Sequence, residues 1–272
     1  MENTLDIRLN KEALVVQANE LIRAPKDDLT LLEAKLIYLT IAQICEGDSE
    51  LYSYSCSIVD LANFLEISKD NIYRDINNLT DSILTKRIYI LDKKKPKKRN
   101  GEPNYNKFQW VSNCRYIDGV ITIRLNDELK PYLLGLYAFL TRYGYKCLFN
   151  LPTYNAMSLF NLLVSYESIV NPYDLRPQCY NRPFPHIERE SNELIFSIPQ
   201  LRRYFNCVDK YPNTNHFIQY VIDISVKCIN KNSPTMKVSY RTAKEGRSIG
   251  YVLFKVNAWS DNDFLDYITK EK

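Results

Sequence analysis

Two stretches of this sequence, 140 residues apart, repeat the same pattern. SIVDLANFLEI begins at Ser57 and SIPQLRRYFNC begins at Ser197, and in both a serine precedes an amphipathic segment with helical periodicity. Each stretch is followed by a second segment whose apolar residues recur at i, i+4, i+7 and i+11, and these two segments lie 145 residues apart. The order of serines and periodic segments is kept over about sixty residues, which indicates an internal repeat. The sequence therefore predicts that one supersecondary unit is present twice.

The elements of each copy match a winged helix-turn-helix, in which two short helices joined by a tight turn are followed by a β-hairpin. A helix is expected before each pair, and the first of these carries a capping box formed by Thr30 and Glu33. The apolar positions expected to be buried in the second helix of each pair are Ile72, Ile76, Leu79 and Ile83 in the first copy, and Phe217, Val221, Ile224 and Cys228 in the second. The hairpins are expected at 107–125, turning at Asp118–Gly119, and at 236–256.

We therefore predict an α+β fold of two tandem winged helix-turn-helix domains related by internal duplication. A length of 272 residues gives room for two domains of ordinary size. The N-terminal domain is expected at 1–146 and the C-terminal domain at 147–272. Near the boundary, DELKPYLLGLYAFL is expected to form an apolar helix, either between the domains or within the first core.

The residue types that build common catalytic and cofactor sites are few or scattered. The seven glycines form no GxGxxG or GxxxxGK[ST] loop, so a nucleotide-binding loop is not indicated. The two histidines, His186 and His216, are distant in sequence, and the seven cysteines include no CxxC pair. We therefore predict no catalytic residues, no metal site and no cofactor, and interpret the cysteines as reduced thiols.

No segment indicates export or a membrane span. The N-terminal MENTLDIRLNKE lacks the apolar core of a secretory signal. The longest apolar run, LLGLYAFL from Leu133, is too short to cross a bilayer. We expect a protein of the bacterial cytoplasm with no membrane partner.

Basic residues are concentrated in the second copy. Residues 194–256 contain ten basic and three acidic residues, whereas residues 1–56 contain five basic and ten acidic ones. Such an asymmetry favours a surface for nucleic acid or for an acidic membrane. We interpret it as a surface for double-stranded DNA.

The second helix of the second copy, 214–230, is the candidate for the major groove. Asparagine and glutamine can each form a pair of hydrogen bonds with adenine, and the N-terminal turn of a recognition helix meets base edges. The residues predicted to contact bases are Asn213, Asn215, His216 and Gln219. A solvated helix face is the alternative for each of them.

Cations around this helix are candidates for phosphate contacts, which position a protein without carrying sequence information. Surface ion pairing is the alternative. The predicted phosphate contacts of the second domain are Arg202, Arg203, Lys227, Lys237, Arg241, Lys244 and Arg247, the last two flanking the expected wing turn at Gly246.

A further group of cations lies in LDKKKPKKRNGEPN, which begins at Leu91. The chain has 36 basic and 32 acidic residues, so without the six cations of this stretch acids would outnumber bases by two. The stretch occupies the expected wing of the first domain, and its like charges predict an extended loop that is disordered without DNA. Its predicted phosphate contacts are Lys93, Lys94, Lys95, Lys97, Lys98 and Arg99. A solvated loop or a nuclear-type signal is the alternative.

The corresponding helix of the first copy, 69–84, has a different exposed face. Its polar residues are mixed in charge, with Asp70, Asp75 and Asp81 beside Arg74. Such a face suits a protein partner or water better than phosphate. We therefore predict that the second domain reads sequence and that the first provides dimerisation and accessory DNA contacts.

Four segments resemble one family, the iteron-binding plasmid replication initiators of the RepA/RepE type. They are VVQANELIRA (15–24), FLTRYGYKCLFNLPTYNAMSLFNLLVSYES (139–168), VIDISVKCIN (221–230) and EGRSIGYVLFKV (245–256). The resemblance covers about residues 15–256 and rests on the order of the segments. This chain departs from the family at Ile218, Gln219 and Tyr220, where basic residues are often found.

The resemblance implies binding to repeated double-stranded sites, the iterons, in a plasmid origin. It also implies a homodimer through the first domain that represses the initiator's own gene, and monomers that open the origin and recruit the host initiator and replicative helicase. A stand-alone winged-helix transcriptional repressor is the alternative. A rolling-circle relaxase is disfavoured, because it needs a metal that is usually held by clustered histidines.

Overall fold

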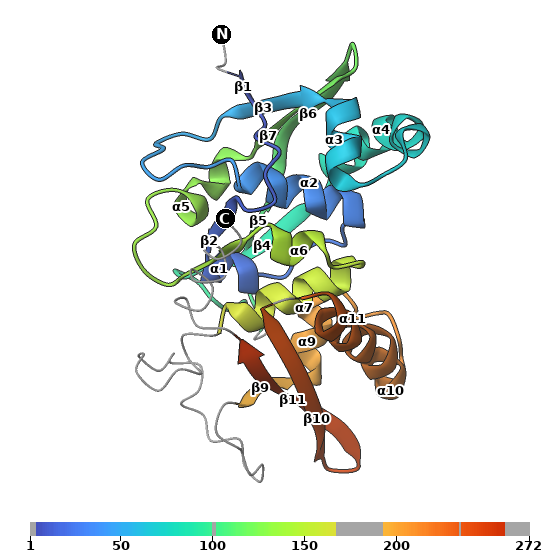
Figure 1. The fold of residues 1–272 in the computed structure, drawn as a ribbon. Helices are drawn as coiled ribbons and strands as arrows, with labels where there is room; N and C mark the ends of the chain where they lie inside the picture. The colour runs from blue at the N-terminus through green and yellow to red at the C-terminus, as the bar shows by residue number, and fades with distance from the viewer. Residues whose placement is uncertain (1–3, 100–101, 167–192, 234, 259–272) are drawn as a thin grey trace. The chain divides into compact units, whose positions relative to one another are not determined.

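The computed structural model describes residues 4–99, 102–166, 193–233 and 235–258. The chain divides into two compact units, Met1–Phe149 and Asn150–Lys272, close to the expected ranges of 1–146 and 147–272. Each unit has its own helices and sheet, and the sequence colours of Figure 1 follow them along the chain.

The first unit combines short helices with several small sheets. Its helices are α1 (Asn19–Arg23), α2 (Leu31–Ile41), α3 (Ile58–Leu65), α4 (Lys69–Ile83), the 3₁₀ turn η1 (Asp127–Leu129), α5 (Lys130–Leu133) and α6 (Lys146–Phe149). Its strands are β1 (Thr4–Asp6), β2 (Leu14–Ala18), β3 (Ser53–Ser57), β4 (Arg87–Leu91), β5 (Tyr105–Gln109), β6 (Val111–Ile117), β7 (Val120–Leu125) and β8 (Leu140–Gly144). The sheet order is β1-β3-β7-β6, with separate pairs β2-β8 and β4-β5.

Local sequence signals explain where these elements begin and turn. The predicted capping box is present: the Thr30 hydroxyl accepts from the Glu33 backbone, and the Glu33 carboxylate accepts from the Thr30 backbone at 2.6 Å. The four isoleucine and leucine residues predicted to line α4 are all buried. Asp118 and Gly119 both have positive φ, at 50° and 79°, as a two-residue hairpin turn of type I′ requires.

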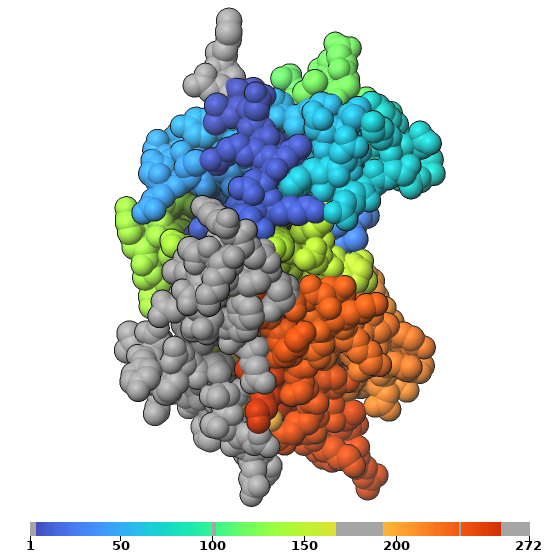
Figure 2. Space-filling model, viewed as in Figure 1, coloured from blue at the N-terminus to red at the C-terminus, as the bar shows by residue number. Residues whose placement is uncertain are grey.

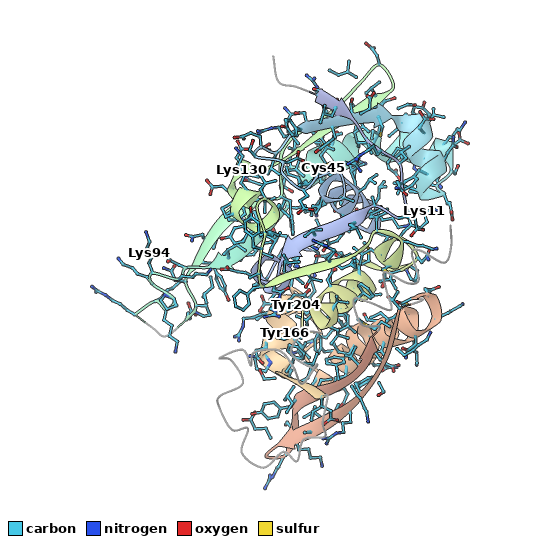
Figure 3. The ribbon with its side chains drawn as sticks, turned by 60° about the vertical axis from the view of Figure 1, so that its left-hand side comes forward. Lys11, Cys45, Lys94, Lys130, Tyr166 and Tyr204 are labelled. Atoms are coloured by element: carbon cyan, nitrogen blue, oxygen red, sulfur yellow. The ribbon has the colours of Figure 1, made fainter. Side chains whose placement is uncertain are left out.

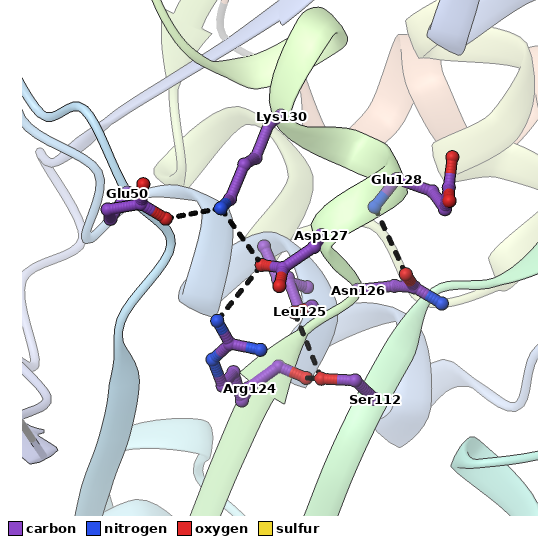
Figure 4. Close-up of polar contacts among 8 residues, drawn as sticks. All are labelled: Glu50, Ser112, Arg124, Leu125, Asn126, Asp127, Glu128 and Lys130. Atoms are coloured by element: carbon purple, nitrogen blue, oxygen red, sulfur yellow. Dashed lines mark hydrogen bonds and ion pairs between the residues drawn. The ribbon is translucent and has the colours of Figure 1, made fainter. Parts of the chain in front are cut away.

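A group of polar contacts fixes the chain where β7 ends (Figure 4). The Arg124 guanidinium donates to Asp127 at 2.9 Å, and the Lys130 ammonium bridges Asp127 and Glu50. The Asn126 side chain caps η1 by accepting from the Glu128 backbone at 3.1 Å. The start of η1 is therefore held to the end of β7.

The sequence predicted an apolar helix after Asp127, and this prediction is wrong beyond Leu133. Gly135 and Phe139 have positive φ, at 59° and 53°, and this conformation ends a right-handed helix. The chain continues as β8, which pairs antiparallel with β2 within the first unit. Apolar composition alone did not distinguish a helix from a strand.

The second unit has the same plan with fewer additions. Its helices are α7 (Tyr154–Val164), α9 (Ile198–Tyr204), α10 (Thr214–Phe217), the π-helical segment η3 (Ile218–Asp223) and α11 (Ile224–Asn232). Its strands are β9 (Glu193–Ser197), β10 (Met236–Glu245) and β11 (Ser248–Ala258), in the order β10-β11-β9. Helix α7 packs against α11, and the Tyr204 hydroxyl of α9 donates to the Ser158 carbonyl at 2.9 Å.

Strand pairing confirms that the two units are copies of one plan. In each, the strand before the helix pair is antiparallel to the second strand of a hairpin: Ser57 pairs with Val120 on β7, and Ser197 pairs with Tyr251 on β11. The wing of the first domain is therefore β6–β7, with its turn at Asp118–Gly119. The equivalent wing of the second domain is β10–β11, and the tip of this hairpin projects from the surface (Figure 2).

The sequence predicted that the basic stretch lies in the wing of the first domain, and this prediction is wrong. The stretch connects β4 and β5, which form a two-stranded sheet of their own between α4 and β6. In the second unit β10 begins soon after α11, at Met236. The prediction failed because two successive hairpins follow α4, and the sequence offered no sign of which one joins β3.

Candidate DNA-binding interface

The helix predicted to enter the major groove is continuous from α10 through η3 to α11. Its capping residue is Asn213, whose side-chain oxygen accepts from the Asn215 backbone at 2.8 Å. This cap is explained by the preference of asparagine for the residue before a helix. The Asn213 oxygen is therefore engaged in the protein itself.

The buried face of this helix differs from the predicted one. Phe217 and Val221 are fully buried as expected, but Ile224 is 42% exposed, and Ile222 and Val226 are buried instead. The cause is the π-helical segment, because a π turn contains more residues than an α turn and shifts every later side chain around the axis. The spacing in the sequence assumed a regular α-helix.

The four residues predicted to contact bases are brought together at the start of the helix. Asn213, Asn215, His216 and Gln219 are all exposed. Asn215 and Gln219 face the wing, where they line an open pocket of about 440 Å³ together with Arg241 and Thr242 of β10. The helix and the wing thus present their polar side chains to one shared concavity.

Sequence reasoning did not select Tyr220, which is 48% exposed on the same helix. Its ring stacks on Tyr211, with ring centroids 6.1 Å apart, and meets the His216 ring edge-on at 5.9 Å. The four-residue spacing between His216 and Tyr220 could have indicated this pair, since such residues are neighbours on a helix.

The acidic side chain of Asp223 also lines the pocket. Asp223 forms an ion pair with Lys227 at 2.6 Å. The pKa of Tyr240 is raised, first by burial and then by the nearby Asp223 carboxylate, which accepts a hydrogen bond from the Tyr240 hydroxyl. Lys227, a predicted phosphate contact, therefore already has a partner, although its side chain remains 74% exposed.

Arg202 and Arg203 are adjacent in sequence but have different surroundings. The Arg202 guanidinium donates to the carbonyls of Cys207, Lys210 and Tyr211 at 2.7–3.2 Å, and it also lies over the Phe217 ring. Arg203 is exposed, and its side chain forms no ion pair with any residue in the described ranges. The geometry thus gives Arg202 a role in fixing the turn and leaves Arg203 available to an anion.

The cations of the wing also divide into engaged and available groups. Arg241 forms a two-pronged ion pair with buried Glu193, both bonds at 2.8 Å, and Lys237 donates to the Asn230 carbonyl at 2.6 Å. Lys244 and Arg247, by contrast, are exposed on either side of Gly246, which has a φ of 64° in the turn. Of these four cations, the two at the wing tip are therefore the ones left available to a partner.

The basic stretch, which we call the basic loop (residues 92–104), forms several local contacts in its described parts, residues 92–99 and 102–104, and its disorder without DNA stays a prediction. Asp92 accepts from the backbones of Lys94 and Lys95, and the Lys98 backbone donates to the Glu102 carbonyl at 2.8 Å. Lys93 forms an ion pair with Glu20 at 2.6 Å. Figure 3 shows Lys94 on this loop, among side chains that point away from the first unit.

The corresponding parts of the first domain are less basic. Helix α4 exposes Asp70 and Asp81, and its Arg74 is paired with Asp75. The tip of the β6–β7 wing carries Ile117, 56% exposed, beside Asp118. Neither element offers the concentration of exposed cations seen at the tip of β10–β11.

Two further findings concern other kinds of site. Among the residues that the structure describes, no group of three or more histidine, cysteine, aspartate or glutamate side chains is arranged to hold a metal ion. Within the same residues, no helix combines the length and the apolar character needed to cross a membrane.

The strand pairing and the two helix pairs define a protein with tandem winged-helix domains. The chain belongs to the family of initiator replication (Rep) proteins, as the sequence resemblance predicted. Residues 14–164 match the model of the family's first winged-helix domain, described as Initiator Replication protein, WH1, and residues 197–256 match the model of the second, Initiator Rep protein, WH2.

A solved structure shares this fold. It is described as the crystal structure of Pi initiator protein in complex with iteron DNA, and it matches with a TM-score of 0.65 at 17% sequence identity. The match covers 93% of this chain and 99% of the other. No curated protein sequence matches the chain.

Proposed function

We propose that this protein is a plasmid replication initiator that binds repeated double-stranded sites, the iterons, at an origin. The observation that carries the proposal is the exposed polar start of helix 214–232 beside a wing whose tip is cationic. Membership of the Rep initiator family and the shared fold with an initiator solved on iteron DNA support it.

The second domain reads the sequence. The side-chain amides of Asn215 and Gln219 lie in the concavity between helix and wing, where each can pair with the N6 and N7 atoms of an adenine. His216 and Asn213 extend this surface toward the start of the helix. Each such amide pair contributes about 1–3 kcal/mol of discrimination against a wrong base.

Cations on both domains hold the phosphates. Arg203 and the wing-tip residues Lys244 and Arg247 anchor the second domain, and the exposed cations of the basic loop add accessory contacts from the first. These contacts supply affinity and register but no base preference. Arg202 acts indirectly by fixing the turn before the recognition helix.

The first domain forms the homodimer that represses the initiator's own gene. Monomers on the iterons open the origin and recruit the host initiator and the replicative helicase. The mixed charge of α4 supports a protein-facing role for this domain, because such a face suits a protein or water better than phosphate. The activity is non-enzymatic and is exercised in the bacterial cytoplasm.

Selection of binding sites from a random duplex library at near-physiological salt tests the proposal. We expect one motif, which recurs as direct repeats near the gene. Gln219→Ala should relax the preference at one position, whereas Asn78→Ala, a matched exposed amide on α4, should leave it unchanged. A single inverted repeat would favour the stand-alone repressor, and binding without any motif would overturn base reading by this helix.

A further inference from the structure

An apolar strip runs along the exposed face of the helix proposed to read DNA. Tyr220 is 48% exposed and Ile224, one turn later, is 42% exposed. The π-helical segment Ile218–Asp223 contains the first and ends immediately before the second. The extra residue of the π turn is what brings Ile224 out of the core, so the strip is a product of this local geometry.

The Tyr220 ring is held in place by the turn that precedes the helix. It stacks on Tyr211 with an interplanar angle of 25°, and His216 meets its edge. Tyr211 is fixed in turn, because its backbone has a φ of 52° and its carbonyl accepts from the Arg202 guanidinium at 2.8 Å. An aromatic side chain braced in this way loses little conformational freedom when a partner covers it.

The major groove offers one apolar group to such a ring. Its edges carry hydrogen-bond donors and acceptors, together with the C5-methyl group of thymine. We propose that Tyr220 is a specificity-determining residue that reads a thymine through this methyl group. The inference rests on the proposed function, and it adds an apolar contact to the amide contacts of Asn215 and Gln219.

The position of Tyr220 on the helix supports this assignment. Asn215 and Gln219 face the wing and its pocket, whereas Tyr220 faces the turn containing Tyr211. The two sides of the exposed face therefore carry different chemistry, polar toward the wing and aromatic toward the turn. A site read by both would place a thymine beside the adenine-reading amides.

Replacement of single thymines by deoxyuridine tests the proposal, because it removes only the methyl group. In the full chain bound to its selected site, we expect one position at which this replacement weakens binding about fourfold, the loss expected for one buried methyl group. Tyr220→Ala should bind more weakly and be insensitive at that position, and Tyr220→Phe should keep the effect. Tyr73→Ala, a matched tyrosine 45% exposed on α4, should also keep it.

A second measurement needs no variant. A 5-bromodeoxyuridine at the sensitive position should form a photo-crosslink to Tyr220, which peptide mass spectrometry identifies. Tolerance of uracil at every thymine, an unchanged uracil effect in Tyr220→Ala, or a crosslink to another element would overturn the inference. A library selection without any motif would instead overturn the proposed function, so the two failures are distinguishable.

Discussion

The two winged-helix domains have one plan but expose different chemistry on it. In the first, the helix corresponding to the recognition helix is mixed in charge and the wing tip carries Ile117 and Asp118. In the second, the helix begins with polar residues and the wing tip carries Lys244 and Arg247. One scaffold therefore presents two different surfaces, because the side chains at two small places on it differ.

The largest contrast we predict is within the second recognition helix. Phe217→Ala, at a fully buried ring, should lower the free energy of unfolding by about 3–5 kcal/mol. Ile224→Ala, seven residues later, should cost less than about 1 kcal/mol, because the π-helical segment exposes this side chain. Chemical denaturation measures both. Equal losses would mean that the helix is regular and that the face predicted from the sequence is the buried one.

The next contrast separates the two neighbouring arginines of α9. Arg202→Ala removes donors from three carbonyls and should destabilise the second domain by about 1–3 kcal/mol. Arg203→Ala should change stability by no more than about 0.5 kcal/mol, because the side chain is exposed, yet weaken DNA binding. Denaturation and a binding titration on each variant provide the comparison. A reversal of the two effects would mean that Arg202 contacts phosphate and that Arg203 stabilises the turn.

A smaller effect should distinguish the two wings. The double substitution Lys244→Gln and Arg247→Gln should reduce the magnitude of the slope of log K against log salt by about 1.8. Each contact between a cation and a phosphate contributes about 0.9 to this slope. Ile117→Ala at the first wing should leave this slope unchanged. Binding titrations at several salt concentrations measure it. A changed base preference in the double variant would mean that the wing also reads sequence.

The basic loop can be tested in the same way. If all six of its cations met phosphates, they would contribute a slope of roughly −5, and the ion pairs of Lys93 and Lys98 predict a smaller value. Neutralising the exposed Lys94, Lys95 and Lys97 should weaken binding to the selected duplex and to random duplexes by the same factor. A larger loss on the selected site would assign base contacts to this loop.

The smallest effect concerns the anchoring of the β4–β5 hairpin. Burial raises the pKa of Asp27, but hydrogen bonds from Tyr89 and Arg87 outweigh it and leave the pKa below its ordinary value. Such a group stabilises the fold above its unfolded pKa of about 3.9 and loses this contribution as the pH falls through the folded value. Asp27→Asn should therefore be less stable than the parent at neutral pH, and the gap should close in acid. Asp70→Asn on α4 provides the control, and a gap independent of pH would contradict the prediction.

Sequence periodicity was sufficient for the parts of the fold that depend on local rules. The capping box at Thr30, the buried stripe of α4 and the turn at Asp118–Gly119 are each set by residues close together in the chain. The internal repeat indicated the tandem winged-helix architecture because each copy shows the same local pattern of caps and apolar spacing. The four candidate base contacts stay a prediction, although they are exposed together at the start of one helix.

The failures occurred where distant pairing or a non-standard turn decided the outcome. Which of two hairpins joins β3 is fixed by strand pairing across more than sixty residues, as between Ser57 and Val120. The π-helical segment has no signature in apolar spacing, so Ile224 was placed on the wrong face. The role of Arg202 depends on a turn whose carbonyls converge only in three dimensions.

The separate sheet formed by β4 and β5 has an evolutionary consequence. Because β3 pairs with β7 and not with this hairpin, residues 92–104 can be lengthened or shortened without changing the register of β3 against β7. Mutations there can adjust overall attraction to polyanions stepwise, one cation at a time. If the second domain reads the sequence, as proposed, related initiators can then diverge in how strongly they hold DNA without a change in the site that they select.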